Sequence, residues 1–358
     1  MKILIVSNHF WPANFRINDL AIGMVERGHD VTVMAGIPDY PQGKFQKGFG
    51  FFRRRREVYQ GVKVHRIPLI PRGGGQKWRL AINYLSSAFC FCLYAPLIGR
   101  KDFDAVFVFD TSPVTIALPA VVIKWLYKVP IVMWVLDLWP ESISATGAIT
   151  NKTILGGVRK LVRFIYRQCD RILISSQGFE DKVHQVGGYD GDVIYFPNWV
   201  EPSIAAANTT AAVELPELPS GFRIVFTGNL GVAQDFEKIL TAAEQLKDYT
   251  DIHWLIVGDG RQLEWVRSEV QRRGLREQFH LLGRYPLDTM PYFFESADAL
   301  LLSLKRDPIF SLTAPGKLQS YLSSGRPILA TLDGEGADIV DRANAGTTCP
   351  AQDAAALV

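Results

Sequence analysis

The sequence is short of cysteine and of net charge, and each shortage excludes a class of protein. Its four cysteines in 358 residues have none of the spacings of a metal site, and so few thiols are most simply explained by a reduced, cytosolic setting. The net charge of +3 is too small to indicate a nucleic-acid ligand by itself. The N-terminal MKILIVSN suits a strand, but Asn8, His9 and Pro12 interrupt it too early for the core of a signal peptide, so none is expected.

Long apolar runs are also scarce, and one stretch reaches the length of a bilayer. No charged residue occurs between Arg79 and Arg100, and a helix of that length could cross the hydrocarbon core. Spanning is disfavoured because residues such as Asn83 and Ser87 are polar, and because the strand predicted at 104–110 should join the same sheet as the strands before the run. We therefore expect a long apolar helix that is buried or lies on a membrane.

What the sequence does have is a regular alternation of strands and helices. Its 48% apolar and 21% charged residues are typical of a globular protein, and 358 residues are enough for two domains. A strand, a helix ended by Gly28 and a second strand open the chain, which predicts a parallel, doubly wound sheet. The strands expected in this sheet lie at residues 2–8, 30–36, 62–68, 104–110, 130–137, 171–176 and 193–198.

A stretch rich in Ala, Thr, Pro and Ser at 201–221 is the best candidate for a linker. The fold class is therefore α/β, with two doubly wound, Rossmann-like domains at 1–200 and 222–358. Ligands of such sheets bind beyond the carboxyl ends of the strands, so we expect a cleft between the two sets of strand ends. The strands expected after the linker lie at residues 223–229, 252–259, 279–284, 299–304 and 327–331.

The most informative stretch for function is residues 306–330, where a loop and a helix lie between two apolar strands. Pro315 is suited to open the helix, and Gly325 is suited to cap its end. Gly316 leaves the backbone open to a ligand, and Lys317 adds a cation to the first helical turn. Free N–H groups, a partial positive charge and a lysine suit a diphosphate. The alternative is an ordinary crossover with a solvated lysine.

Candidate residues of the first domain also follow its strands. Asn14 and Arg16 come after the first strand, at a possible site for an acceptor or a phosphate. Asp137 ends a predicted strand in the motif DLWPES, where its carboxylate and that of Glu141 are the candidate catalytic groups. A helix N-cap or an Asx turn is the alternative role for Asp137.

Residues 37–61 interrupt the alternation with prolines, glycines and aromatic residues beside a run of four arginines. A loop of this length in a compact domain is usually functional or disordered. Arginines next to phenylalanines would suit an anionic membrane surface or a lipid-linked phosphate. A solvated charge run beside an edge strand is the alternative. The arginines are Arg53, Arg54, Arg55 and Arg56, and the phenylalanines are Phe49, Phe51 and Phe52.

Taken together, the motifs resemble those of the retaining, nucleotide-sugar-dependent glycosyltransferases of family 4, which have the GT-B fold of two facing Rossmann-like domains. The resemblance covers nearly the whole chain. The motifs PDYPQGKFQKGF and DLWPES make it most similar to bacterial enzymes of O-antigen, capsule and colanic-acid-type polysaccharide synthesis, including fucosamine transferases. The other motifs are the first 36 residues, FPNWVE, FTGNLG, VGDG, LGRYPLDTMPYFFESADALLLSL and APGKLQSYLSSGRPIL.

The resemblance implies roles for further residues. Asn198 in FPNWVE lies at the hinge where members of the family contact the donor, and Lys317 and Gly316 would hold its diphosphate. Asp137 would orient or polarise a hydroxyl of the sugar or the acceptor. The remaining donor-binding positions implied by the matching motifs are Gly228, Asn229, Gln234, Gly258, Arg284 and Tyr285.

The sequence also departs from the family pattern. Many members have an arginine and a lysine after the first strand of the second domain, two glutamates eight apart near the donor helix, a double glycine in the opening and a histidine after the fifth strand. These departures make Lys317 and its helix the leading diphosphate candidates, with Arg16 across the cleft. In this chain, Asn229 and Gln234 occupy the positions of the arginine and the lysine, and Leu312 and Ser320 occupy those of the two glutamates. Ala13 and Asn14 occupy the positions of the double glycine, and Asp137 occupies that of the histidine.

The implied function is transfer of a sugar, an amino- or deoxyhexose, from a nucleotide donor such as a UDP-sugar to a lipid-linked saccharide, with retention. Cations and helix dipoles can stabilise the leaving diphosphate, and no metal cofactor is expected. The enzyme would lie on the cytoplasmic face of the membrane as a peripheral protein.

Two alternatives are a non-catalytic sugar- or nucleotide-binding scaffold and a UDP-amino-sugar epimerase of the same fold, for which Asp137, Glu141 and His9 are the available acid–base groups. GT-B proteins usually end in a helix that returns to the first domain. Because residues 352–358 look like the start of a helix, the second domain is expected to be truncated.

Overall fold

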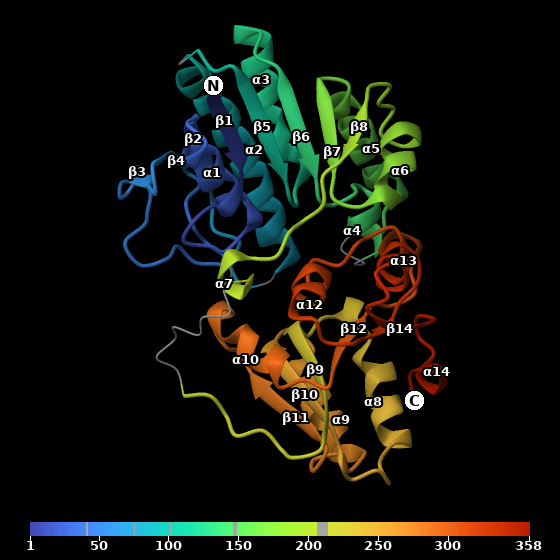
Figure 1. The fold of residues 1–358 in the computed structure, drawn as a ribbon. Coiled ribbons are helices and arrows are strands. Elements are labelled where there is room, and N and C mark those ends of the chain that lie inside the picture. The colour runs from blue at the N-terminus through green and yellow to red at the C-terminus, as the bar shows by residue number, and fades with distance from the viewer. Residues whose placement is uncertain (41, 75, 101, 146–148, 206–213) are drawn as a thin grey trace. The chain divides into compact units, whose positions relative to one another are not determined.

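The computed structural model describes residues 1–358 except 41, 75, 101, 146–148 and 206–213. The chain folds into two compact units, Met1–Pro197 and Asn198–Val358, here called the N-unit and the C-unit (Figure 1). Residues 206–213 of the predicted linker at 201–221 lie outside the described residues. Pro41, in the predicted loop at 37–61, also lies outside them. Each unit is described by itself.

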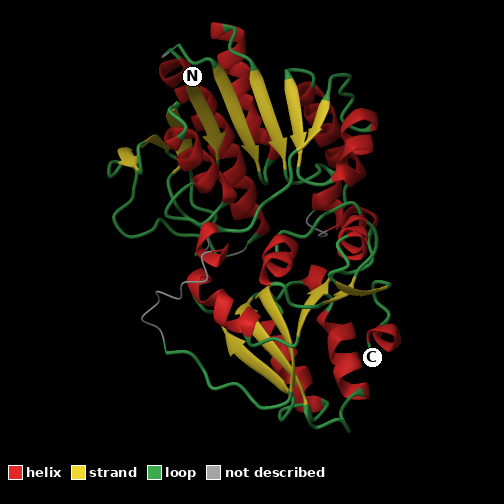
Figure 2. Cartoon of the chain, viewed as in Figure 1, coloured by secondary structure: helices red, strands yellow, loops and turns green. Residues whose placement is uncertain are grey.

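The N-unit is built on an eight-stranded sheet in the order β3-β4-β2-β1-β5-β6-β7-β8. Every neighbouring pair is parallel except β3 with β4. Figure 2 shows these strands as arrows with helices beside them. The strands are β1 Lys2–Ser7, β2 Asp30–Gly36, β3 Arg56–Tyr59, β4 Val62–Ile67, β5 Ala105–Asp110, β6 Ile131–Val135, β7 Arg171–Ile174 and β8 Val193–Tyr195.

The central strands of this sheet form because they are continuous apolar runs that helices cover on both faces. Leu4, Ile5 and Val6 of β1 have no exposed surface. The α-helices are α1 Arg16–Glu26, α2 Lys77–Gly99, α3 Leu118–Tyr127, α4 Glu141–Ala145, α5 Lys152–Tyr166 and α6 Glu180–Gln185, and the 3-10 turns are η1 Val114–Ala117 and η2 Gln177–Phe179.

The C-unit has a six-stranded parallel sheet in the order β11-β10-β9-β12-β13-β14. Its strands are β9 Phe222–Asn229, β10 Ile252–Asp259, β11 Phe279–Gly283, β12 Ala299–Ser303, β13 Ile328–Thr331 and β14 Gly346–Cys349. Its α-helices are α7 Pro202–Ala205, α8 Phe236–Gln245, α9 Leu263–Arg272, α10 Met290–Glu295, α11 Pro308–Ser311, α12 Leu318–Ser324, α13 Glu335–Arg342 and α14 Ala354–Leu357, and its 3-10 turns are η3 Val232–Gln234 and η4 Leu287–Thr289.

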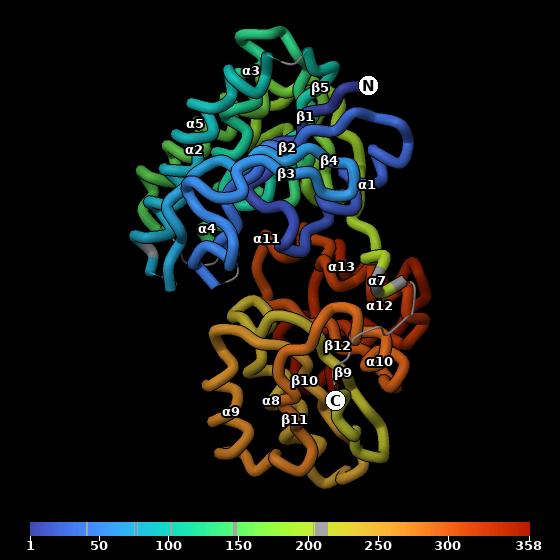
Figure 3. The backbone as a smooth tube through the Cα atoms, turned by 90° about the vertical axis from the view of Figure 1, so that its left-hand side faces the viewer, coloured from blue at the N-terminus to red at the C-terminus, as the bar shows by residue number. Residues whose placement is uncertain are grey.

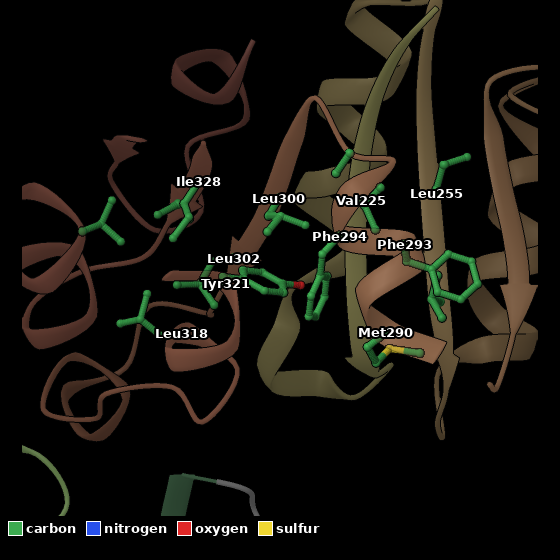
Figure 4. Packing of buried hydrophobic residues seen from close by; sticks show 14 of the residues in the cluster. Val225, Leu255, Met290, Phe293, Phe294, Leu300, Leu302, Leu318, Tyr321 and Ile328 are labelled. Atoms are coloured by element: carbon green, nitrogen blue, oxygen red, sulfur yellow. The ribbon is translucent and has the colours of Figure 1, made fainter. Parts of the chain in front are cut away.

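Two apolar layers form the core of the C-unit, one on each face of its sheet. Alternate residues of a strand point to opposite faces, so Val225 packs in one layer and Phe226 in the other. The layer of Val225 includes Leu255, Leu300 and Tyr321 (Figure 4). Burial of each large side chain in these layers stabilises the folded C-unit by roughly 1.5–3 kcal/mol relative to leaving it exposed. The two layers therefore hold β9 and its neighbouring strands together.

The predicted fold class is confirmed, since both units contain a parallel, doubly wound sheet. Three local predictions are wrong. Residues 56–59, predicted within a loop, form the antiparallel edge strand β3. The helix α12 begins at Leu318 rather than at Pro315, so Lys317 is its N-cap and not part of its first turn. Asp137 lies two residues beyond the end of β6 rather than in the strand.

Candidate active site

The sheet of the C-unit opens beside β9. This strand pairs with β10 along its whole length but with β12 only at Ile224 and Val225. Beyond Val225 the two strands separate, and a wedge opens between their carboxyl ends. β9 leads through α8 to β10 on one side, whereas β12 lies on its other side. Ligands of doubly wound sheets bind at such a switch point.

Tyr321 of α12 fills the deep part of this wedge. The backbone N–H of Thr227, which β12 no longer reaches, donates to the Tyr321 hydroxyl at 2.9 Å, and the Thr227 hydroxyl lies 3.3 Å from the same oxygen. The Tyr321 ring packs edge to face against Phe294, with centroids 5.6 Å apart (Figure 4). The parted strands are thus held open by a side chain that also satisfies the orphaned backbone donor.

Lys317 points into the same wedge, one helical turn before Tyr321, whose backbone N–H donates to the Lys317 carbonyl. Part of the Lys317 side chain is accessible, but its Nζ is buried and lies 3.6 Å from the centroid of the Phe226 ring. Nζ has no hydrogen-bond partner among the described residues. Burial lowers the pKa of the Lys317 ammonium to about 7.

A buried ammonium group without a partner calls for an anion. Lysine carries three N–H donors, and the face of Phe226 offsets only part of the loss of water, by about 2 kcal/mol or more for a desolvated cation. Gly228 leaves space above Nζ, since a Cβ at this position would lie 3.4 Å from the nitrogen. An anionic oxygen placed there would satisfy the free donors of Lys317.

The glycines predicted to bind the donor serve first to bring two strand ends together. A Cβ on Gly258 would lie 1.8 Å from the carbonyl oxygen of Gly228, and a Cβ on Gly260 would lie 2.3 Å from the carbonyl oxygen of Leu230. The ends of β9 and β10, and the loops that follow them, therefore pack backbone to backbone. Gly258 supports the loop that borders the wedge, and Gly228 lies at the wedge itself.

Asn229 and Gln234, which replace the cations common in the family, differ in their freedom. The side-chain oxygen of Gln234 accepts the backbone N–H of Gly231 at 3.1 Å, so it closes its own loop. Asn229 is exposed at the end of β9. Gly316 is also exposed, and nothing lies within 4 Å of a Cβ built on it. Asn229 and Gly316 are therefore open to a ligand, whereas the side-chain oxygen of Gln234 already accepts a hydrogen bond from its own loop.

Two other predicted donor residues follow a strand that does not border the wedge. Arg284 and Tyr285 follow β11, the edge strand, which is separated from β9 by β10. Tyr285 packs edge to face against Phe293 at 5.0 Å between centroids, and Arg284 is exposed. Asn198 opens the C-unit, and its Oδ1 is buried without a hydrogen-bond partner among the described residues.

A carboxylate that the sequence did not predict reaches α12. The resemblance led to a glutamate being expected where the chain has Ser320. In the structure, the Ser320 hydroxyl donates to Glu201 Oε2 at 3.4 Å. Glu201 precedes α7, which packs against the C-unit through the buried Ile204. The segment after Asn198 therefore brings a carboxylate to the place where α12 itself has none.

The carboxyl ends of β1 and β2 in the N-unit carry a network of paired polar groups. Asp39 accepts the backbone N–H of Arg72 at 2.9 Å and the Asn83 amide at 3.2 Å, and the Arg72 guanidinium lies 3.6 Å from the same carboxylate. Arg72 also lies 3.1 Å from Nε2 of His9. Burial, followed by the charge of Arg72, lowers the pKa of His9 to about 3, so its imidazole is neutral at physiological pH.

Asp137 is held between the ends of β5 and β6. Its Oδ2 accepts the backbone N–H and the hydroxyl of Ser112, at 3.2 and 3.0 Å. The indole of Trp139 donates to the same hydroxyl at 3.1 Å. Burial raises the pKa of Asp137, and the two hydrogen bonds from Ser112 oppose that shift. Asp137 thus links two strand ends and does not cap α4, whose first residue is Glu141.

A second carboxylate, Asp110, lies behind Asp137 at the end of β5. It is fully buried, and neither side-chain oxygen has a hydrogen-bond partner among the described residues. Burial and the charge of Asp137 raise the pKa of Asp110 well above its usual range, so Asp110 is the protonated member of the pair. Burial raises the pKa of the Tyr84 hydroxyl; the charge of Arg72 opposes this shift, and the charge of Asp137 adds to it.

Asn14 and Arg16 lie at the start of α1, as predicted. Asn14 is exposed, and Arg16 is the first residue of the helix. The loop before them is fixed by Asn18, whose side chain accepts the Trp11 N–H at 3.0 Å and donates to the Ala13 carbonyl at 2.8 Å. This loop therefore has a defined shape, with Asn14 on its surface.

The run of four arginines does not form a uniform solvated face. Arg54 lies over the Phe49 ring at 5.0 Å and beside Glu57 at 3.6 Å. Arg55 donates to the Arg66 carbonyl at 2.5 Å and to the Phe51 carbonyl at 3.0 Å. Arg54 and Arg55 thus make contacts within the N-unit. Arg53 and Arg56 are exposed.

Sequence reasoning did not single out Asp39, Arg72, Tyr84, Ser112 or Asp110. Asp110 ends β5, and Ser112 lies two residues beyond it, so the rule that placed Asp137 at a strand end would have found both. Asp39 and Arg72 lie outside the strands and come together through long-range contacts that also involve Asn83 of α2, and no local pattern predicts such contacts.

Comparison with family models assigns both units. Residues 13–199 match the model described as Glycosyl transferase 4-like domain, and residues 221–358 match Glycosyl transferases group 1. Two curated relatives are similar over most of the chain. WcaI of Escherichia coli K12, a glycosyl transferase assigned to colanic acid biosynthesis, is 27% identical over 93% of this chain and 84% of its own length. WbjE of Pseudomonas aeruginosa, assigned as a glycosyltransferase, is 25% identical over 78% of this chain and 71% of its own length.

Solved structures of similar fold have lower sequence identity. Sucrose-phosphate synthase of Thermosynechococcus elongatus superposes with a TM-score of 0.72 at 15% identity, covering 99% of this chain and 87% of its own. Anabaena HepE in complex with UDP and glucose gives a TM-score of 0.64 at 15% identity, with the same coverage. WaaG, a glycosyltransferase of lipopolysaccharide biosynthesis, gives 0.63 at 13% identity, covering 100% and 88%. With two doubly wound units and both family models matched, the chain belongs to the glycosyltransferases that combine a family-4-like N-terminal domain with a group 1 C-terminal domain in the GT-B fold.

Proposed function

We propose that this glycosyltransferase moves an amino- or deoxyhexose, with retention, from a UDP-sugar to a lipid-linked saccharide in the synthesis of a bacterial surface polysaccharide. The observation that carries the proposal is the buried Nζ of Lys317, which lies at the switch point of the C-unit sheet and has no hydrogen-bond partner in the described part of the chain. The relative assigned to colanic acid biosynthesis supports the polysaccharide class, and the UDP complex of HepE supports the nucleotide.

In this proposal, Lys317 binds the diphosphate and stabilises the charge that develops on it as the sugar leaves. The apolar surroundings of Nζ, formed by Phe226, strengthen that interaction because little water is present to screen it. Asn229 and Gly316 are open at the same strand ends and are available to the rest of the donor. An ammonium group where negative charge develops supports a route without a metal cofactor.

Asp137 is the proposed catalytic residue of the N-unit. Its two hydrogen bonds from Ser112 occupy one carboxylate oxygen and leave the other to accept a proton or a hydrogen bond from a substrate hydroxyl. Asp137 accepts two hydrogen bonds, whereas the carboxyl group of Asp110 accepts none among the described residues, so in this proposal the negative charge of the pair is carried by Asp137. Glu141 is the first residue of α4, four residues after Asp137, and is a secondary candidate.

Calorimetry with UDP tests the role of Lys317. Replacement of Lys317 by Ala should weaken UDP binding by about 10- to 150-fold, the equivalent of roughly 1.5–3 kcal/mol for a charge-assisted contact. Lys247→Ala is the matched control, because its Nζ contacts the Arg273 carbonyl after α9, away from the carboxyl strand ends, and it should leave affinity within twofold. Equal UDP affinity in the Lys317 variant and the control would remove Lys317 from the site.

Product analysis separates transfer from the two alternatives. The protein would be incubated with radiolabelled UDP-sugars and a bacterial membrane fraction. Label in the lipid fraction indicates transfer, whereas a new nucleotide sugar in solution would indicate an epimerase. UDP-sugar binding with neither product would indicate a scaffold.

A further inference from the structure

The helix α2 exposes apolar residues and buries polar ones. From Ala81 to Leu97, every exposed residue is apolar. The large exposed side chains recur at three- and four-residue spacing and therefore form one stripe along the helix. Each is between 38% and 70% exposed, and they are Trp78, Ile82, Leu85, Phe89, Leu93 and Leu97.

The opposite side of α2 is tied to the sheet by polar contacts. Asn83 donates to the Ile70 carbonyl at 2.6 Å, and Ser87 donates to the Asn8 side chain at 2.9 Å. The strands before and after the helix, β4 and β5, both belong to the N-unit sheet. By length and composition the helix could cross a bilayer, but as a crossover within one sheet it presents only its outer side to the surroundings.

Two neighbouring helices continue this apolar surface. The hydroxyl of Tyr127 in α3 donates to the Pro96 carbonyl of α2 at 2.7 Å. Trp125 of α3 is 54% exposed, and its ring packs edge to face against Phe164 of α5 at 5.9 Å. Figure 3 shows α2, α3 and α5 along one side of the N-unit. We call the stripe on α2, together with Trp125 and Phe164, the apolar face. Monomeric soluble proteins rarely leave such a continuous apolar surface uncovered.

A basic groove borders the apolar face on α5. The sequence from Lys152 to Tyr166 contains four cations and no carboxylate. The groove has a volume of about 280 Å³ and is lined by Lys160, Arg163, Phe164, Arg167 and Gln168. No ion pair joins its three cations to a carboxylate in the part of the chain that the structure describes. Arg163 and Arg167 each donate through Nε to a backbone carbonyl, that of Val186 at 2.9 Å and that of Gly188 at 3.4 Å. These contacts position the two side chains without neutralising them, so the positive charge of the groove is available to an external anion.

We propose that the apolar face and the basic groove dock on an anionic phospholipid bilayer, with α2 lying along the interface and the groove taking a lipid phosphate. This placement rests on the proposed function, in which the acceptor is linked to lipid. An apolar strip beside cations that no carboxylate neutralises among the described residues is the pattern of interfacial helices. A second copy of the chain fits less well, because a symmetric contact through this surface would bring two sets of like charges together.

On this docking surface, the four-arginine run at 53–56 is not the main membrane contact. Arg54 lies beside the carboxylate of Glu57, which reduces its net charge. Arg55 lies 5.3 Å from the Tyr94 ring on α2 and donates to the Phe51 carbonyl, so its side chain is turned toward the N-unit. Arg53 and Arg56 are exposed and are left as a secondary contribution.

Co-sedimentation with sucrose-loaded vesicles tests the proposal without reference to activity. Vesicles of phosphatidylethanolamine and phosphatidylglycerol would be compared with vesicles of phosphatidylcholine. The triple variant Leu85→Gln, Phe89→Gln, Leu93→Gln should lose at least tenfold in binding to the anionic vesicles. The triple variant Lys160→Gln, Arg163→Gln, Arg167→Gln should lose about 100-fold and its salt dependence, since each cation near an anionic surface contributes about fivefold.

Two control variants keep the test specific. Phe222→Gln with Tyr249→Gln removes exposed aromatic residues of the C-unit and should bind as the unaltered protein does. Arg53→Gln with Arg56→Gln should lose less than the α5 variant. Circular dichroism and UDP calorimetry would show that each variant is folded.

Three outcomes would overturn the proposal. They are absence of sedimentation with anionic vesicles, unchanged binding of the α2 variant, and a dimer in analytical ultracentrifugation that the α2 variant converts to monomer. If UDP binding and transfer persist without vesicle binding, the docking surface is wrong and the proposed function stands. If vesicles are bound as expected but UDP-sugars give no product, the docking surface stands and the proposed function is wrong.

Discussion

The strand ends of the two units show opposite arrangements of charge on similar sheets. In the C-unit, Lys317 projects a cation into a wedge lined by Phe226, without a partner among the described residues. In the N-unit, Arg72 is paired with Asp39, and Asp137 accepts two hydrogen bonds from Ser112. The two units are built alike, but one leaves a charge uncompensated and the other satisfies its charges internally.

This difference indicates a division of work. An unpaired ammonium in an apolar setting gains most from an anion that arrives from outside, because it begins from an unfavourable state. A paired network gains little from an anion but holds its groups in fixed positions, which suits the orientation of neutral hydroxyl groups. This difference supports the proposal that the diphosphate binds to the C-unit and the reacting hydroxyl to the N-unit.

Asp137→Asn gives the sharpest test of the N-unit half of this comparison. The amide keeps the shape of the side chain and removes the charge, so turnover should fall by about 10²-fold or more, while UDP affinity stays within twofold. Steady-state kinetics and calorimetry measure the two quantities. Asp110→Asn is the matched control, because a protonated Asp110 is already neutral, and its loss of turnover should be under fivefold. Normal turnover in Asp137→Asn would leave Asp137 as a residue that only joins two loops.

Tyr321→Phe tests how the wedge of the C-unit is held open. The change removes the acceptor of the Thr227 N–H and leaves that donor buried, which should lower the free energy of opening of β9 by about 1–3 kcal/mol. Hydrogen exchange of the β9 peptide, followed by mass spectrometry, measures this free energy. Tyr249→Phe, at an exposed position, should change it by less than about 0.5 kcal/mol. Equal exchange in both variants would mean that another group satisfies Thr227.

The pH dependence of UDP binding tests whether the anion meets a titrating cation. Burial lowers the pKa of Lys317 from 10.5 to about 7, so the amine is charged below about pH 7 and neutral above it. UDP affinity should therefore be highest below pH 7 and fall by up to about tenfold per pH unit above it. Calorimetry between pH 6.5 and 8.5 measures the profile. Lys317→Ala should give a flat profile, and a flat profile in the unaltered protein would contradict the assignment.

The central strands were predictable because burial on both faces requires continuous apolar runs, and these appear directly in the sequence. The edge strand β3 was missed because only alternate residues of REVY are partly buried, and an exposed strand carries no apolar signature. The start of α12 was displaced because Pro315 begins a turn, in which the Leu318 N–H donates to the Pro315 carbonyl, before the helix proper.

The candidate site was predictable to the extent that one local motif carried it. Lys317 could be found because Pro, Gly and Lys occur together before a helix. Its isolation from hydrogen-bond partners, and the 3.6 Å approach to Phe226, depend on where β12 leaves β9, which no local pattern encodes. The contact of Glu201 with Ser320 joins residues more than a hundred positions apart, so it required the folded chain.

The backbone contact between the carboxyl ends of β9 and β10 determines which substitutions this protein tolerates. Any side chain at Gly258 would meet the carbonyl oxygen of Gly228, 1.8 Å from its first carbon, and the obstacle is main chain that no rotamer can clear. A missense change in this codon would push apart the two strand ends that border Lys317. In a library of random mutants selected for activity, position 258 should therefore be depleted of substitutions as strongly as the lysine, although the glycine has no side chain to offer a substrate.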